Sequence, residues 1–319
     1  MKRGLAISAA VAGGLGVWTG VRFRNWSRRE KARLRSGGTL QSTASGPIEY
    51  ASRGEGPVVL IAHGALGGYD QGLAIANLMG IPGVRFLAVS RPGYLRTPLQ
   101  SGRTYRDQAH LFAAFLDSME ISQAVVMGIS AGGPAALEFA REHPGKCAGV
   151  ILLSAISRRL REQDVRVPPA LALASTPFWD FGGWLMQGLM HRKPGTAARW
   201  MLQPQESEML RDPGMRAAFL SLADTFVPFS PRRAGLLNDG EQIGLYPDAA
   251  PAGIECPALI LHGTADDVVP YEHATSAAAA IPGAELVPLP GGGHLAGVFQ
   301  PGAVNSNIER FLSAVRGSV

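Results

Sequence analysis

The stretch Ala124-Val125-Val126-Met127-Gly128-Ile129-Ser130-Ala131-Gly132 joins a short apolar run to a serine bracketed by glycines. A run of this length, followed by a helical pattern over residues 131–143, indicates a buried strand that turns sharply into a helix. Gly128 and Gly132 let the backbone make that turn and let strand and helix approach closely. The pattern G-x-S-x-G is typical of a serine held on a strained turn, with its hydroxyl exposed.

The alternation of apolar runs and helical patterns continues on both sides of this stretch. We expect buried strands at 58–62, 85–90, 124–129, 149–154, 258–261 and 285–289, and helices at 104–120, 131–143, 271–281 and 303–315. Strands that alternate with helices are typical of a parallel sheet covered on both faces. Residues 158–250 break the rhythm, because they contain no strand pattern and many prolines. We read this interval as a helical insertion over an α/β core.

Composition and charge exclude several classes of protein. Apolar residues make up 46% of the 319 residues and charged residues 17%, which excludes a globally disordered chain. Residues 1–36 hold nine Lys/Arg and one acid, whereas the remainder carries 21 Lys/Arg against 24 Asp/Glu. Since the body is mildly acidic, we expect no nucleic-acid partner. Two cysteines, no H-x-x-x-H spacing and no phosphate-binding glycine motif predict neither a metal nor a cofactor.

The N-terminal segment, residues 1–38, has the pattern of an anchor or a signal. Residues 4–21 are uncharged, and as a helix they would span about 27 Å, close to the ~30 Å hydrocarbon core of a bilayer. Seven basic residues follow within 22–35, which favours a cytoplasmic position for the downstream domain. We expect membrane association through residues 4–21. Export after cleavage near Ala10-Val11-Ala12 and a disordered basic leader are the alternatives. The segment carries no motif, so we expect the chain from about Gly38 onward to suffice for chemistry.

Three more positions carry chemistry just past the ends of predicted strands. His63-Gly64-Ala65 closes the run 58–62, and an N–H there can pair with that of Ala131 to hold an oxyanion. Asp266 follows the run 258–261, and His294 follows the last strand. Open α/β sheets place their sites at these strand ends. A histidine can take and return a serine proton, while a buried carboxylate fixes its tautomer.

With these residues the chain resembles the α/β-hydrolase fold superfamily, in its esterase/lipase-like branch. The resemblance implies a mostly parallel central sheet flanked by helices, with a helical cap inserted. It divides the chain into the N-terminal segment 1–38, the first part of the hydrolase core at 39–157, the cap or lid at 158–250, and the second part of the core at 251–319. It implies Ser130 as nucleophile, His294 as base, Asp266 as orienting acid, and the amides of Ala65 and Ala131 as the oxyanion hole.

Several neighbouring residues have competing interpretations. Asp267 competes with Asp266, but the family pattern G-x-x-D-x-x-V-P selects Asp266, and we expect Asp267 to cap the following turn. His63 is expected to be a hydrogen-bonded structural histidine. For Arg91 we expect an ion pair that supports its loop, in preference to substrate contact.

The resemblance implies a serine esterase that hydrolyses carboxylic esters through an acyl-enzyme, on small-molecule esters with apolar acyl or aryl groups. Ser130 disfavours the dehalogenase and epoxide-hydrolase branches, which use aspartate there. The alternatives are a carbon–carbon bond hydrolase of ring-cleavage products, disfavoured by Ala131 where such relatives have methionine, and a non-catalytic binding protein. Trp179, Trp184 and Met186 are expected either to line the substrate pocket or to form the core of the cap.

The two cysteines each directly precede a predicted strand. On the implied topology these strands are parallel neighbours, and neighbouring strands run about 4.8 Å apart. This spacing would bring Cys147 and Cys256 inside the ~4.4–6.8 Å Cα window of a disulfide. A bridge would fit export, and two reduced thiols would fit the cytoplasm.

Overall fold

The computed structural model describes residues 2–161, 179–197 and 202–316, and a single eight-stranded sheet forms its centre. The strand order is β1-β2-β4-β3-β5-β6-β7-β8. The strands from β3 to β8 run parallel, while β1 and β2 form an antiparallel edge. The strands are β1 (Thr39–Gln41), β2 (Ile48–Arg53), β3 (Val58–Ala62), β4 (Arg85–Ser90), β5 (Ala124–Ile129), β6 (Cys147–Leu153), β7 (Ala258–Gly263) and β8 (Glu285–Leu289).

The six strands expected from the sequence are all present, and the α/β-hydrolase architecture is confirmed. β6 starts two residues earlier than expected, at Cys147, and β7 continues to Gly263. The edge strand β1 and its neighbour β2 were not expected. β2 lacks an apolar run because it contains Glu49, which is fully buried and paired with Arg96 across 2.6 Å.

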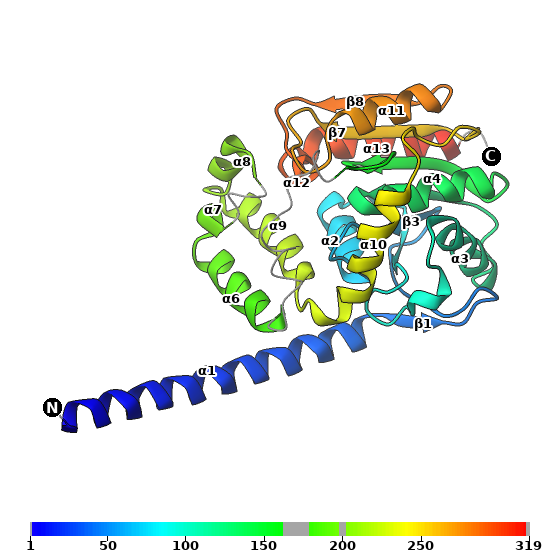
Figure 1. Cartoon of the computed structure of the whole chain (residues 1–319). Helices are drawn as coiled ribbons and strands as arrows, with labels where there is room; N and C mark the ends of the chain where they lie inside the picture. The colour runs from blue at the N-terminus through cyan, green and yellow to red at the C-terminus, as the bar shows by residue number, and fades with distance from the viewer. Residues whose placement is uncertain (1, 162–178, 198–201, 317–319) are drawn as a thin grey trace.

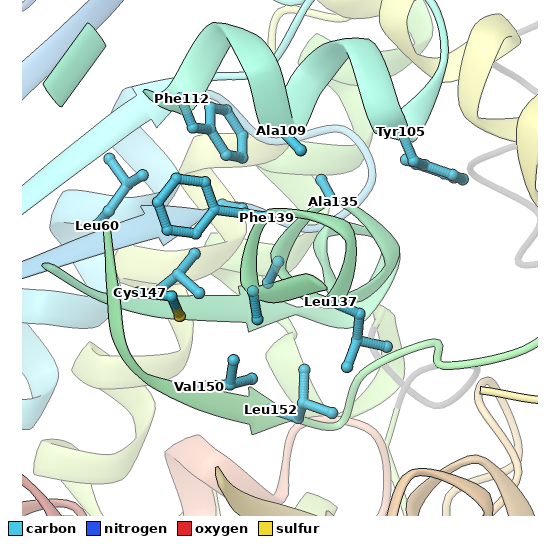
Figure 2. Packing of buried hydrophobic residues seen from close by; sticks show 14 of the residues in the cluster. Leu60, Tyr105, Ala109, Phe112, Ala135, Leu137, Phe139, Cys147, Val150 and Leu152 are labelled. Carbon is cyan, nitrogen blue, oxygen red and sulfur yellow. The ribbon is translucent and has the colours of Figure 1, made fainter. Parts of the chain in front are cut away.

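Side chains alternate along the strands between two apolar layers. Val59 and Ile61 of β3 point into the layer formed with α2 (Tyr69–Met79) and α13 (Pro301–Arg316). Leu60 and its neighbours point into the opposite layer, which Figure 2 shows packed under α3 (Tyr105–Ser118) and α4 (Gly133–Glu142), and which also includes α11 (Glu272–Ala280). Because both faces are buried, the central strands read as continuous apolar runs.

The predicted helical insertion is confirmed between β6 and β7, where Figure 1 shows α6, α7, α8 and α9 grouped beside the core. Within the described part of 158–250 there is no strand; residues 162–178 and 198–201 lie outside the description. The cap helices are α6 (Trp179–Arg192), α7 (Pro194–Ala197), α8 (Pro204–Met209), α9 (Pro213–Ala223) and α10 (Arg233–Leu245).

Two fully buried arginines fasten the cap to the core. Arg91, after β4, makes a two-point ion pair with Asp239 of α10 at 2.8 and 2.5 Å, and its Nε donates to His63 O. Arg232, just before α10, makes a second such pair with Asp70 of α2 at 3.1 and 2.8 Å. The supporting ion pair expected for Arg91 is therefore confirmed, and its partner belongs to the cap.

The N-terminal segment forms one long helix, α1 (Lys2–Gly37), whose first half extends away from the rest of the chain (Figure 1). Its second half packs onto the body: Trp26 and Leu34 are each 5% exposed, and Tyr69 donates its hydroxyl to Leu34 O across 2.9 Å. This part of the predicted tail has a packing role that the basic sequence pattern does not reveal.

The sequence predicts an anchor at residues 4–21. No helix among the residues described is both long and apolar enough to cross a bilayer. Five glycines within 4–21 weaken the hydropathy of that stretch.

The cysteines meet as expected at the starts of two parallel neighbours, β6 and β7. Their sulfurs lie 3.5 Å apart and both thiols are free. A disulfide requires about 2.05 Å between the sulfurs. Cys147 and Cys256 are therefore two separate thiols in contact.

Candidate active site

Ser130 occupies the sharp turn between β5 and α4. Its φ of 50° lies in the left-handed region, which non-glycine residues adopt only where surrounding structure enforces it. A Cβ at Gly128 would lie 2.8 Å from Gly133 Cα, and one at Gly132 would collide with the carbonyl oxygen of Ala62. The two glycines of the motif therefore permit the close packing that holds Ser130 in this strained conformation.

The structure brings Ser130, His294 and Asp266 together. His294 Nε2 lies 3.0 Å from Ser130 Oγ, and His294 Nδ1 lies 2.8 Å from Asp266 Oδ2. Both distances are those of hydrogen bonds. With the proton on Nδ1, the imidazole donates to the carboxylate and its Nε2 can accept the serine proton, which is the arrangement of a Ser-His-Asp triad.

Asp266 is held by more than the histidine. Its Oδ1 accepts the backbone N–H groups of Val268 and Val269, both at 2.9 Å. Asp266 thus caps the turn that follows it, because its side chain points back over the turn. His262 Nε2 lies 3.3 Å from Asp266 Oδ2. Burial raises the pKa of Asp266, but His294, His262 and the Val269 N–H outweigh it and hold that pKa well below its usual range.

The base is tuned by neighbouring carboxylates. Burial lowers the pKa of His294, and the charge of Asp266 and its hydrogen bond to the imidazole oppose burial. Asp267 and Glu206 act in the same direction, and together the three carboxylates leave the pKa of His294 above its ordinary value. A raised pKa makes the imidazole a stronger base for the serine proton.

The loop after β3 passes directly against the serine. A Cβ on Gly64 would lie 3.1 Å from Ser130 Cβ, and Ala65 packs against the small cluster that contains Ala131. Gln71 Oε1 accepts the Gly64 N–H across 2.9 Å, which fixes the loop from the side of α2. Ala65 and Ala131 therefore lie on the two backbone segments that flank Ser130.

His63 is a structural histidine, as expected. Its Nε2 accepts the backbone N–H of Arg91 across 3.0 Å, so Nδ1 carries the proton and donates to Gly64 O across 2.7 Å. Burial, with the charge of Arg91, lowers the pKa of His63 well below its ordinary value. The neutral imidazole, with both ring nitrogens hydrogen-bonded to the backbone, holds the loop that carries Ala65 in place.

A pocket opens beside Ser130 and His294. Its described lining is mainly apolar, with Gln71, Ser154 and Asn305 as further polar side chains. The apolar side chains are Ala65, Leu66, Ile75, Leu78, Met79, Ile129, Leu153, Met186, Leu222, Phe226, Val268, Leu295, Val298 and Val304.

The three cap residues expected at the pocket separate into two groups. Met186 lines the pocket, whereas Trp179 and Trp184 are not among its described lining. Trp179 and Trp184 belong to an apolar cluster with Trp26 of α1 and Phe229. These positions fit the alternative interpretation, in which the two tryptophans form part of the core of the cap, because α1 covers them.

Sequence reasoning missed three residues that support the triad: Gln71, His262 and Glu206. Each bonds to backbone groups or to a residue far away in the sequence, so no local motif marks it. A helical pattern over 69–79, bounded by Gly68 and Gly80, could have placed Gln71 on α2. Across the described ranges, no cluster of His, Cys, Asp and Glu is arranged to hold a metal ion.

Comparison with known proteins places this geometry in a family. The alpha/beta hydrolase fold model matches residues 57–301. An α/β hydrolase fold protein from Nakamurella multipartita is 32% identical, with a TM-score of 0.76 over 87% of this chain and 98% of that one. The uncharacterised hydrolase YcgS of Bacillus subtilis is 29% identical over 260 residues, which cover 78% of this chain and 89% of the relative. A thermophilic esterase from Thermogutta terrifontis shares the fold, at 22% identity and a TM-score of 0.64 over 87% of this chain and 98% of that one. The match to the family model and the geometry of the Ser130 site agree, and this chain belongs to the α/β hydrolase fold family.

Proposed function

We propose that this chain is a serine esterase that cleaves carboxylic esters with apolar acyl or aryl groups through an acyl-enzyme. The observation that carries the proposal is the hydrogen-bonded line from Ser130 Oγ to His294, at 3.0 Å, and on to Asp266, at 2.8 Å. Activation of a serine by an adjacent histidine that a carboxylate orients is the arrangement needed for nucleophilic acyl transfer.

The reaction proceeds in two halves. Ser130 Oγ attacks the acyl carbon while His294 Nε2 takes its proton, and the amides of Ala65 and Ala131 stabilise the oxyanion. The protonated His294 then gives that proton to the departing alcohol, which leaves Ser130 acylated. In the second half, His294 takes a proton from water, the hydroxide attacks the acyl carbon, and Ser130 leaves with its proton restored.

The lining of the pocket supports the proposed substrate class. Its described lining offers apolar side chains from α2, the cap and the 295–304 segment, and no Asp, Glu, Lys or Arg. Transfer of apolar groups from water into such a lining is favourable by about 25 cal/mol per Å² buried, whereas an unpaired charge is costly. The pocket therefore supports apolar acyl or aryl esters over dicarboxylates.

Rates over a series of 4-nitrophenyl esters with acyl chains of two to twelve carbons test this proposal. We expect kcat/KM to rise with chain length until the pocket is filled, and an ester with a terminal carboxylate to be poor. A preference for the charged ester, or hydrolysis of none of the series by folded protein, would contradict the proposal.

We also propose that α1 lies on an anionic lipid surface. Val17, Trp18 and Val21 are 71%, 56% and 54% exposed, and basic residues follow them on the same helix. Exposed apolar residues beside basic ones are typical of helices that lie in the membrane interface.

Sedimentation with anionic and with neutral vesicles tests this proposal. We expect binding to anionic vesicles that decreases with salt, and equal recovery in the supernatant with both kinds would contradict it.

A further inference from the structure

One carboxylate of the cap is buried against the loop that carries His294. Glu206, in the first turn of α8, is 2% exposed. Its Oε1 accepts the backbone N–H of Gly293 across 2.9 Å, directly before His294. Its Oε2 accepts the backbone N–H of Gln203, also across 2.9 Å. A capping box needs only the second of these bonds; the first joins the cap to the catalytic loop.

Two neighbours of Glu206 hold the same region. Gln203 donates its side-chain amide to Ala265 O across 2.8 Å, directly before Asp266. Gln205 donates to Gly291 O across 2.5 Å. The start of α8 is thus hydrogen-bonded both to the loop that carries Asp266 and to the loop that carries His294.

The contact leaves no room for a Cβ at position 293 unless the side chains of Glu206 and Gln203 shift. A Cβ on Gly293 would lie 2.9 Å from Glu206 Oε2 and 2.9 Å from Gln203 Cγ. The glycine therefore lets the carboxylate reach the backbone, and the side chain of His294 leaves the chain one residue later. A shift of Glu206 would be passed directly to the peptide that orients the imidazole.

The charge of Glu206 matters as well as its position. Burial is the main cause that raises the pKa of Glu206, and the N–H groups of Gln203 and Gly293 oppose it. Keeping a carboxylate in such a place costs free energy unless it is well bonded or faces a positive charge. The cation that forms nearby during catalysis is protonated His294. Asp266 and Asp267 are the other carboxylates that act on this imidazole.

On the basis of the serine-hydrolase function proposed above, we infer that Glu206 is a positioning residue for His294. Its carboxylate fixes the peptide before the imidazole, so that Nε2 stays at Ser130, and its negative charge favours the imidazolium formed when Ser130 loses its proton. The cap is thereby part of the support of the triad, in addition to forming a wall of the pocket.

The test compares Glu206→Gln with Glu208→Gln, a matched control that removes the same charge from an exposed position of the same helix. In Glu206→Gln, one carboxylate oxygen is replaced by an NH2 group, which is a donor. It faces the backbone N–H of either Gly293 or Gln203, so one of the two hydrogen bonds is lost. We expect kcat for a 4-nitrophenyl ester to fall by about tenfold or more and the acid limb of kcat/KM to move to lower pH. Glu208→Gln should change neither.

Glu206→Asp separates position from charge. Its shorter side chain withdraws the carboxylate but keeps its sign, so we expect kcat to fall while the acid limb stays at the wild-type pH. If Glu206→Gln does not fold, this variant decides the matter: a wild-type kcat would overturn the inference. Wild-type kcat and acid limb in folded Glu206→Gln would overturn it equally.

A readout without substrate keeps the inference distinct from the proposed function. In Ser130→Ala protein, NMR titration of His294 with and without Glu206→Gln measures the imidazole directly. We expect a lower pKa for His294 when Glu206 is replaced, and an identical titration would refute the role of the charge. If the wild-type chain hydrolyses no ester, the proposed function fails, while this titration still shows whether Glu206 acts on His294.

Discussion

Trp26 of α1 donates its indole N–H to Gln187 Oε1 of α6 across 2.7 Å, which ties the N-terminal helix directly to the cap. Phe23, one turn earlier, packs against Trp184 with ring centroids 6.0 Å apart. Because α6 also carries Met186 into the pocket, α1 supports a wall of the candidate active site from outside.

Two truncations separate the packed half of α1 from its exposed half. A chain that starts at Gly38 loses Trp26 and Leu34, and we expect its free energy of unfolding to fall by about 3 kcal/mol or more. A chain that starts at Arg22 keeps these contacts and should unfold like the full chain. Urea unfolding of the three proteins makes the comparison, and equal midpoints for all three would show that α1 does not stabilise the body.

The buried pair of Arg91 and Asp239 gives a stability prediction. Arg91→Met leaves Asp239 buried without its cationic partner, which typically costs about 3–5 kcal/mol. Arg91→Met combined with Asp239→Leu removes both charges and should recover part of that loss. Thermal unfolding of the two variants measures the difference. A double variant less stable than the single one would mean that the pair acts through more than its charges.

The two adjacent aspartates should differ sharply. Asp266→Asn removes the acceptor of the His294 Nδ1 proton, and we expect turnover to fall by about four orders of magnitude. Asp267→Asn should be mild, because Asp267 acts on His294 only as one of three carboxylates. Ester hydrolysis by the purified variants checks the ranking, and the reverse order would assign the acid to Asp267.

The pH profile should follow the raised pKa of His294. Neutral His294 is the base. We therefore expect kcat/KM to reach its maximum above the pKa of His294 and to fall as the pH drops below that pKa. Because the pKa is raised, we expect the acid limb of wild-type activity above pH 6.5, the ordinary pKa of a histidine. A kcat/KM profile with its acid limb below that value would show that the carboxylates do not outweigh burial.

Met186 and Leu189 provide a matched pair for the pocket. Both lie on α6, but Met186 lines the pocket while Leu189 is 47% exposed. Met186→Glu places a charge against an apolar acyl chain, and we expect KM for long-chain esters to rise about tenfold or more. Leu189→Glu should leave kinetics unchanged. Equal KM values in both variants would remove Met186 from the substrate site.

Much of the core could be predicted because its signals are local. The strands from β3 to β7 are buried on both faces and almost entirely apolar, and the Gly128–Gly132 motif specifies its own turn. Ser130, Asp266 and His294 follow strand ends, so a parallel topology brings them together before any contact is known. Strand β2 was not predicted because Glu49, buried beside Arg96, breaks its apolar pattern.

The support of the site could not be predicted in the same way. Glu206 bonds to a backbone N–H 87 residues away, and Arg91 to a carboxylate 148 residues away. Backbone groups leave no mark in the sequence, and the partner of a charged residue depends on the packing of the cap. For the same reason Trp26 looked like part of a basic tail, although α6 covers it.

The most direct test of the account is the mass of the protein during turnover. Rapid quenching with a 4-nitrophenyl ester should show one added acyl group, located on the peptide that contains Ser130, and Ser130→Ala should show none and lose turnover by several orders of magnitude. Unimpaired turnover in Ser130→Ala, or the acyl group on another residue, would contradict it.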